Sequence, residues 1–114
     1  MPRDVFVEYW LRRREVLSNL SIYLAKIKEA VLELDPQAEV YLFGSFAKGT
    51  ARPDSDVDIL VVSDKYGSSL GKIAELLVHV EKRLGFAGVF EIHVATRELY
   101  ETWYKRFIDV KIKL

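Results

Sequence analysis

Apolar side chains recur at helical spacing along the first third of the chain, through residues 6–34. The pattern ends at Asp35-Pro36, because the residue before a proline is disfavoured in the helical region of backbone conformation. A single helix over this range would be about 45 Å long, whereas a domain of this size is only about 35 Å across. The pattern therefore predicts either a helix that is broken within residues 14–19, or a first half that projects and needs a partner.

The rest of the chain alternates short apolar runs with helical stripes. Strands are expected at residues 39–43, 57–62 and 89–94. The expected helices are a single turn over residues 46–48 stopped by Gly49, a helix capped by Ser68 or Ser69 that reaches Leu84 before Gly85, and a last helix capped by Thr96 that reaches Phe107. Residues 108–114 alternate between apolar and polar side chains, which indicates a short edge strand.

The order of these elements predicts the fold class. The first two strands are joined by a short loop, which favours an antiparallel pair. The second and third are joined through a helix, which favours a parallel pair with a right-handed crossover. We therefore expect an α/β (α+β) fold with a small mixed sheet and helices on one face. The chain is interpreted as a single domain, residues 1–114, with residues 1–17 as an N-terminal helical extension.

Composition excludes several classes of protein. Lys and Arg number 17, and so do Asp and Glu, so the formal net charge is zero and no generally basic nucleic-acid surface is expected. The absence of cysteine excludes disulfides, thiolate chemistry and Cys-ligated zinc. No stretch resembles a signal peptide or approaches the roughly 20 apolar residues of a membrane span. We expect a cytoplasmic protein without membrane contact.

Thermolabile side chains are scarce in this sequence. Asn19 and Gln37 are the only side-chain amides, and Met1 is the only methionine. Such scarcity favours a thermophilic source.

Two aspartates at the start of the second strand suggest chemistry. Asp56 and Asp58 point to the same side of the strand, because side chains alternate. Two carboxylates so close repel each other unless a cation neutralises them, and no Lys or Arg lies within the strand. Glu91 on the third strand can face the same cleft. Three carboxylates predict a site for Mg²⁺ or Mn²⁺, with two ions as in phosphoryl-transfer sites.

The turn after the first strand is placed to meet a phosphate. In an antiparallel pair the end of the first strand lies beside the start of the second, so Ser45 is expected next to Asp56. Gly44 allows a ligand to approach the backbone closely, and Ser45 opens a helical turn with free N–H groups. Lys48, with Arg52, can add positive charge for a triphosphate.

The stretch GSFAKGTARPDSDVDILV, residues 44–61, closely resembles the Gly-Ser…Asp-x-Asp signature of the DNA polymerase β-type nucleotidyltransferase superfamily. The short chain resembles the minimal nucleotidyltransferases of archaea and bacteria, as found in HEPN toxin–antitoxin pairs. The order of elements extends the match over residues 20–107. Gly49 and Ser55 also occupy signature positions, whereas many members carry Asp where this chain has Glu91.

This resemblance implies a polymerase β palm-like fold and transfer of a nucleoside monophosphate, AMP above all, from a nucleoside triphosphate to a hydroxyl. It implies that Asp56, Asp58 and Glu91 are catalytic metal ligands. It also implies nucleotide-binding roles for the residues of the Gly-Ser turn and loop, namely Gly44, Ser45, Lys48, Gly49 and Ser55. Some minimal members act as antitoxins by adenylylating a HEPN-domain partner.

Two classes of function stay open. The first is an active Mg²⁺-dependent transferase acting on a protein partner or an RNA end. The second is a non-catalytic antitoxin that neutralises a partner protein by contact. The segment 4–17 is expected to mediate association, with a second copy or with a helical partner, because its apolar stripe is more than the fold needs.

Other residues have two interpretations each. His93 shares the face of Glu91 and can touch substrate or only support it. Trp103-Tyr104 can stack a nucleobase or belong to the core. The three arginines at positions 12–14 can meet RNA phosphates or form a solvated helix face, and we favour the solvated face.

Overall fold

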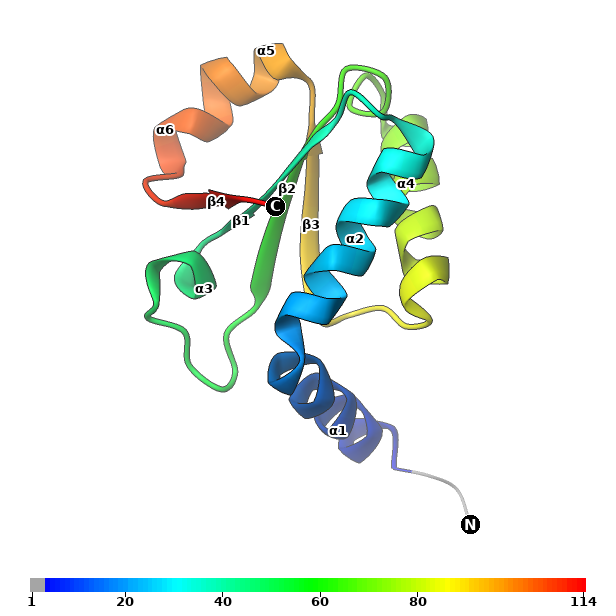
Figure 1. Cartoon of the computed structure of the whole chain (residues 1–114), viewed down its shortest axis with the longest axis vertical. Helices are drawn as coiled ribbons and strands as arrows, with labels where there is room; N and C mark the ends of the chain where they lie inside the picture. Colours follow the sequence, from blue (N-terminus) through cyan, green and yellow to red (C-terminus); the bar gives the residue numbers. More distant parts are fainter. Residues whose placement is uncertain (1–3) are drawn as a thin grey trace.

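A four-stranded mixed sheet forms the centre of the computed structural model, which describes residues 4–114 (Figure 1). The strands lie in the order β3 (Phe90–Ala95), β2 (Val57–Val62), β1 (Glu39–Phe43) and β4 (Lys111–Lys113). β1 is antiparallel to both β2 and β4, whereas β2 and β3 are parallel. This arrangement confirms the expected mixed sheet.

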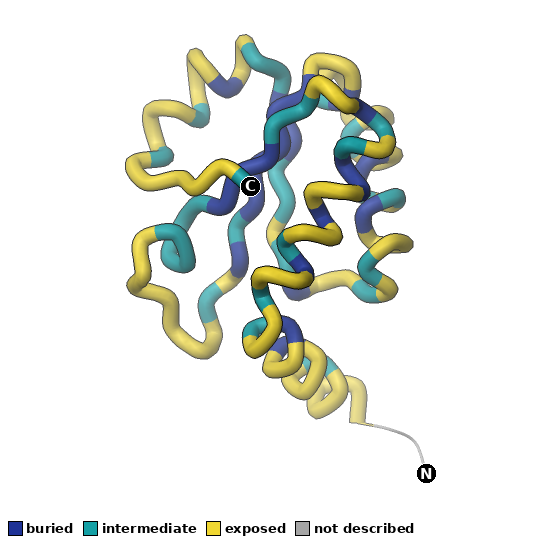
Figure 2. Tube along the Cα trace, in the orientation of Figure 1, coloured by how far each residue is buried: buried dark blue, intermediate teal, exposed yellow. Residues whose placement is uncertain are grey.

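One face of the sheet packs against two helices, α2 (Leu20–Leu34) and α4 (Leu70–Leu84). The helices form because each carries an apolar stripe, and α4 begins at Ser69, whose side chain accepts a hydrogen bond from the Lys72 N–H, and ends at Gly85. The core between them is fully buried and includes Ile27, Val31, Ile59, Val61, Leu76 and Val80. Figure 2 shows these buried segments as the dark blue centre of the molecule.

The opposite face is covered by the C-terminal helical segments, which corrects the expectation that helices lie on one face only. These segments are α5 (Arg97–Leu99), the π-helical η1 (Tyr100–Tyr104) and α6 (Lys105–Phe107). Tyr100 is buried against Leu60 and Val62, and its ring stacks on Tyr41. Because β2 is apolar on both faces along its second half, the sheet needs cover on both sides.

The predicted break in the N-terminal helical pattern occurs at Asn19, between α1 (Val5–Ser18) and α2. Asn19 leaves helical geometry, with φ −130° and ψ 36°. The last turns of α1 pack on the domain through Val16, which is buried with Tyr23 and Val89. The first turns are exposed, at the end of the molecule drawn lowest in Figure 1. Residues 1–3 of the predicted extension lie outside the described residues.

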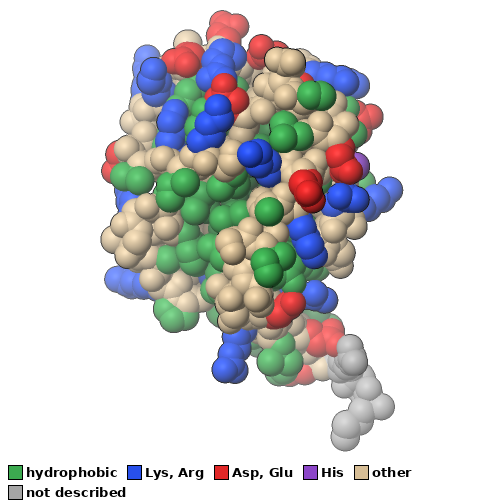
Figure 3. All heavy atoms as spheres, viewed as in Figure 1, with side chains coloured by type: hydrophobic (Ala, Val, Ile, Leu, Met, Phe, Trp, Pro, Cys, Tyr) green, Lys and Arg blue, Asp and Glu red, His purple; other side chains and the backbone are tan. Residues whose placement is uncertain are grey.

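Short elements fill the remaining edges. α3 (Ser45–Lys48) is a single turn that ends at Gly49, which has a left-handed φ of 76°. β4 is the predicted edge strand and pairs with the end of β1. Figure 3 shows apolar side chains gathered between α2 and the side of the molecule formed by α3 and β4. Among residues 4–114, no helix is both long and apolar enough to cross a membrane.

Candidate functional site

The acidic side chains meet where β2 and β3 begin. The parallel register places Asp58 directly beside Glu91. Ligand atoms of Asp58, Glu91 and His93 all lie within 4.8 Å of one another. Side chains alternate along both strands, so these three share the face that carries Leu60 and, further along, the C-terminal helical segments.

Asp58 is the most perturbed member of this cluster. Burial raises its pKa to about 6, and the neighbouring negative charges of Glu91 and Asp56 add to the effect, against an opposing contribution from His93. A carboxylate in this position is stabilised by a nearby cation. The electrostatics therefore favour binding of positive charge at the start of β2.

Asp56 lies just outside the group of three. It is exposed, immediately before β2, at the end of a loop made by residues 50–55. Its charge is close enough to raise the pKa of Asp58. The site is thus an inner pair, Asp58 and Glu91, with Asp56 at its solvent side.

Gly44 leaves the space that this site needs. The register pairs Phe43 with Asp58, so the turn after β1 lies against the carboxylate. A Cβ at position 44 would lie 3.1 Å from Asp58 Cγ and closer still to its Oδ2. Gly44 also has φ 72° and ψ −155°, a conformation that is essentially restricted to glycine. Only glycine leaves room for the Asp58 carboxylate in its present position.

The donor set fits a hard divalent cation such as Mg²⁺ or Mn²⁺. Carboxylate oxygens are the ligands such ions prefer. An imidazole suits softer metals, so His93 fits better as a partner of Glu91, from whose Oε1 its Nε2 lies 3.4 Å. The His93 ring is held edge-on between Phe43 and Tyr104, with centroids 5.5 and 5.9 Å away.

The predicted phosphate-side residues lie around the turn and the following loop. Ser45 is the first residue of α3. The Ser55 hydroxyl accepts a hydrogen bond from the Arg52 N–H at 2.8 Å and so closes the loop. Lys48 forms an ion pair with Asp109 at 3.0 Å, and this bond holds the pKa of Asp109 below its usual value. In this structure Lys48 therefore joins α3 to the C-terminal segment.

The aromatic pair on the last helical segment divides between two environments. Tyr104 is half-buried beside His93. Trp103 is 55% exposed and contacts Phe107, with ring centroids 5.0 Å apart. Trp103 is therefore not a core residue.

The expectation of a wholly solvated arginine face on α1 is wrong for Arg13. This side chain is 2% exposed and donates hydrogen bonds to the carbonyls of Pro53 and Ser55, in the loop before Asp56. Nothing in the local sequence distinguishes Arg13 from its neighbours at positions 12 and 14. The only available signal was the helical phase that Arg13 shares with Trp10, Leu17 and Leu20.

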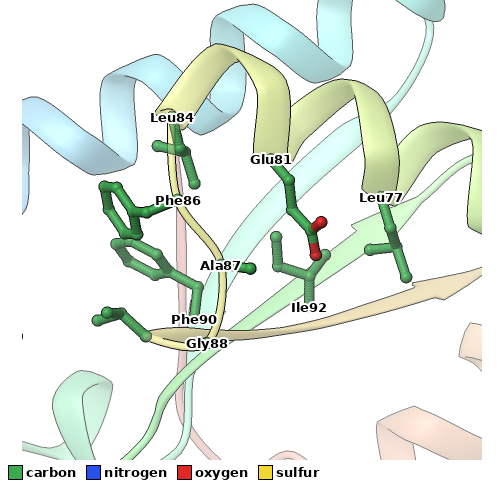
Figure 4. A pocket seen from close by; sticks show the side chains of 9 residues that line it. Leu77, Glu81, Leu84, Phe86, Ala87, Gly88, Phe90 and Ile92 are labelled. Carbon is green, nitrogen blue, oxygen red and sulfur yellow. The ribbon is translucent and has the colours of Figure 1, made fainter. Parts of the chain in front are cut away.

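An apolar pocket of about 110 Å³ lies on the other face of β3 (Figure 4). Phe90 and Ile92 line it from the strand, and Leu77 and Glu81 line it from α4. Because these strand residues alternate with Glu91, the pocket opens away from the acidic cluster. It is not part of the candidate site.

Comparison with protein-family models gives a match to the nucleotidyltransferase domain over residues 24–114. The match includes the sheet, the acidic cluster and the Gly44 turn, and it begins within α2. Thus α1 lies outside the matched region.

Three curated relatives align with 60–68% of the chain. Protein adenylyltransferase MntA of Thermococcus cleftensis is 38% identical over 69 residues, which are 60% of this chain and 69% of that protein. The protein MJ1379 of Methanocaldococcus jannaschii, whose name proposes a protein adenylyltransferase, is 33% identical over 62% of this chain and 72% of its own length. Poly(A) RNA polymerase protein 2 of Saccharomyces cerevisiae is 33% identical over 68% of this chain, which spans only 14% of the yeast protein.

Two solved structures have the same fold. A crystal structure of a proposed nucleotidyltransferase has a TM-score of 0.66 and 30% identity, and the match covers 80% of this chain and 96% of that one. A second, from Sulfolobus solfataricus, has a TM-score of 0.57 and 23% identity, covering 98% and 87% of the two chains. At that identity the second match supports the fold alone.

Proposed function

The chain belongs to the nucleotidyltransferase domain family, and from that premise we propose that it transfers AMP from ATP to a hydroxyl group of a protein. The observation that carries the proposal is the meeting of Asp58 with Glu91 beside Gly44. Such a pair of crowded carboxylates beside a glycine turn suits a metal-bound triphosphate. Transfer of a nucleotide is the activity of the family, and the choice of AMP and of protein is our inference.

Asp56, Asp58 and Glu91 would hold two Mg²⁺ or Mn²⁺ ions. When bound, such ions neutralise charge on the phosphates and on the attacking oxygen. Gly44 leaves room for the Asp58 carboxylate beside the turn, since a Cβ at position 44 would collide with it. His93 keeps Glu91 oriented through its Nε2 and is itself fixed by two aromatic rings.

The choice of a protein acceptor rests on the names of the relatives from Thermococcus cleftensis and Methanocaldococcus jannaschii, both of which include the words protein adenylyltransferase. A HEPN-domain protein from the same genome is the partner we propose first, from the resemblance to minimal nucleotidyltransferases. An RNA end is the competing acceptor, since the yeast relative is named as an RNA polymerase. This chain carries zero formal net charge, which favours the protein over the RNA.

A labelling experiment tests the proposal. The purified chain is incubated with α-labelled ATP and Mg²⁺, together with the HEPN-domain protein or with an RNA oligonucleotide. We expect label on the protein, and none when Asp58→Asn replaces the wild type. Label on the RNA alone would show that the acceptor is RNA and not protein. The absence of label on both acceptors, with Mg²⁺ and with Mn²⁺, would contradict the proposed activity.

A second candidate is a binding module that neutralises its partner by contact. The observation in its favour is the outer side of α1, where Phe6 is 71% and Leu11 60% exposed. Such a patch favours association with a partner or with a second copy. Phe6→Ser with Leu11→Ser tests this better than deletion of residues 2–14, which would also remove Arg13. If the protein is a binding module, the double variant should lose partner binding in light scattering. The wild type should then bind the partner but transfer no labelled nucleotide to it.

A further inference from the structure

A buried arginine connects α1 to the loop before the carboxylates. Arg13 is 2% exposed, while Arg12 and Arg14 on either side of it are exposed. A buried guanidinium is costly unless its N–H groups are satisfied by acceptors. The position of those acceptors therefore shows what the buried charge is used for.

Both acceptors are backbone carbonyls in one short loop. Arg13 Nε donates to the Pro53 oxygen at 2.9 Å, and Nη2 donates to the Ser55 oxygen. The two carbonyls lie two residues apart, which suits the planar fork of a guanidinium and not the single point of a lysine ammonium. Asp56 follows Ser55 directly.

Few other backbone hydrogen bonds hold the loop next to Asp56. The β2 ladder with β3 begins at Val57, and the ladder with β1 reaches only as far as Asp58. Before that point, the described contacts within the loop are the turn in which the Ser55 N–H donates to the Arg52 oxygen and the Ser55 hydroxyl accepts from the Arg52 N–H. At the far end of the loop the Thr50 N–H donates to the Ser45 oxygen. Next to Asp56, the described hydrogen bonds from outside the loop are those of Arg13.

We propose that Arg13 is a positioning residue for the metal site, acting through the carbonyls of Pro53 and Ser55 on Asp56. The inference rests on the proposed function for the role of Asp56 as a ligand. Both hydrogen bonds of the buried Arg13 go to backbone carbonyls, so the proposed role is exercised through the loop and not by contact with phosphate or metal. By this argument α1, which lies outside the matched family region, is part of the catalytic apparatus.

The test compares Arg13→Met and Arg13→Lys with Arg14→Met, the matched exposed control on the next position of the same helix. Two readouts are used: Mn²⁺ binding followed by electron paramagnetic resonance, and amide hydrogen exchange of the metal-free protein. We expect Arg13→Met to weaken Mn²⁺ binding roughly tenfold, as loss of an outer contact to a ligand does. Exchange should rise in peptides covering residues 52–58 and remain unchanged in α4. Arg13→Lys can donate to one of the two carbonyls, so its Mn²⁺ affinity and exchange rates should lie between those of Arg13→Met and the wild type. Arg14→Met should match the wild type in both readouts.

A double-variant cycle separates positioning from a general structural role. In the Asp56→Asn background, Arg13→Met should produce no further loss of Mn²⁺ affinity, because the group on which it acts is already gone. An equal loss in both backgrounds, or faster exchange with unchanged Mn²⁺ affinity, would overturn the inference. If Arg13→Met fails to fold, the Arg13→Lys variant carries the same comparison. If the wild type binds no Mn²⁺, the proposed function fails, while the exchange data still report whether Arg13 holds the loop.

Discussion

The two faces of the central sheet differ in what their side chains do. On the face under α2 and α4, alternate residues of β2 are Val57, Ile59 and Val61, all completely buried. On the other face, the same strand presents Asp58 and then Leu60. The first face is apolar along its whole length. The second is divided between an apolar anchor under Tyr100 and a polar end that carries the candidate site.

Neighbouring residues of β2 therefore have different roles, because side chains alternate between the two faces of the sheet. Those on the α2–α4 face stabilise the fold, and those at the polar end of the other face form the candidate site. Replacing a side chain on the α2–α4 face should change the free energy of unfolding. Replacing one at the polar end should change ligand binding and turnover, with unfolding unchanged or even made less favourable.

Asp58→Asn should have the largest effect, on activity. We expect turnover to fall on the order of a thousandfold, equivalent to about 4 kcal/mol, since a group at the reacting phosphate is lost. The free energy of unfolding of the metal-free protein should rise, because burial and two neighbouring carboxylates disfavour this charge. Labelling kinetics and urea denaturation measure the two effects. Asp54→Asn, on an exposed loop position, is the control and should change neither.

Ile59→Ala should give the opposite pattern. Removing this fully buried side chain from the α2–α4 face should lower the free energy of unfolding by about 2–5 kcal/mol. The folded fraction should keep its Mn²⁺ affinity, because Ile59 points away from the carboxylates. Urea denaturation and metal titration at low temperature check both parts. A loss of affinity as large as that of Asp58→Asn would show that the two faces are not separable.

Gly44→Ala should affect both quantities, since Gly44 lies where the two strands meet the site. The strained backbone should cost about 1–3 kcal/mol of stability, and the collision with Asp58 should also lower Mn²⁺ affinity. Gly71→Ala is the matched control, because a Cβ at that helical position meets open space. The control should raise stability by about 1 kcal/mol. Equal thermal shifts for the two variants would contradict the assigned geometry.

The pH dependence of the metal-free protein should give the smallest effect. The pKa of Asp58 is raised from its ordinary value of 3.8 to about 6 in the folded protein, so between these pH values the folded state binds more protons than the unfolded state. Stability is therefore highest below pH 4 with respect to this group and falls as pH rises towards 6. Because the site is partly solvated, we expect the free energy of unfolding to fall by about 1 kcal/mol over this pH range. Asp58→Asn should abolish this component, and an unchanged profile would refute the assignment.

Strand positions were predictable because their patterns are local. Residues 39–43 and 57–62 form β1 and β2 as expected, and the third strand is displaced by one residue to Phe90–Ala95. Glu91 could be placed beside Asp58 because parallel pairing and alternation together fix both the neighbour and the face. These inferences need only the spacing of apolar residues and the short connections.

Other features depend on contacts between distant segments. The burial of Arg13 depends on carbonyls 40 and 42 residues later in the chain, and three consecutive arginines show only a polar helix locally. The ion pair of Lys48 with Asp109 depends on the path of the C-terminal segment. That segment covers the second face because Tyr100 finds an apolar surface there, which the helix pattern alone could not indicate.

The two bonds of Arg13 also have a consequence for the order of folding. Each closes a loop of 40 residues or more, so each costs more chain entropy to form than the β1–β2 contacts, and we expect both bonds to form after that pair. The sheet, whose β1–β2 pair closes a much shorter loop, can assemble before that event. In a refolding experiment we therefore expect tertiary fluorescence to recover in an early phase and the full affinity for Mn²⁺ to appear only in the last one. The chain would then pass through a state that is largely folded but binds metal only weakly, and Arg13→Met should resemble that state.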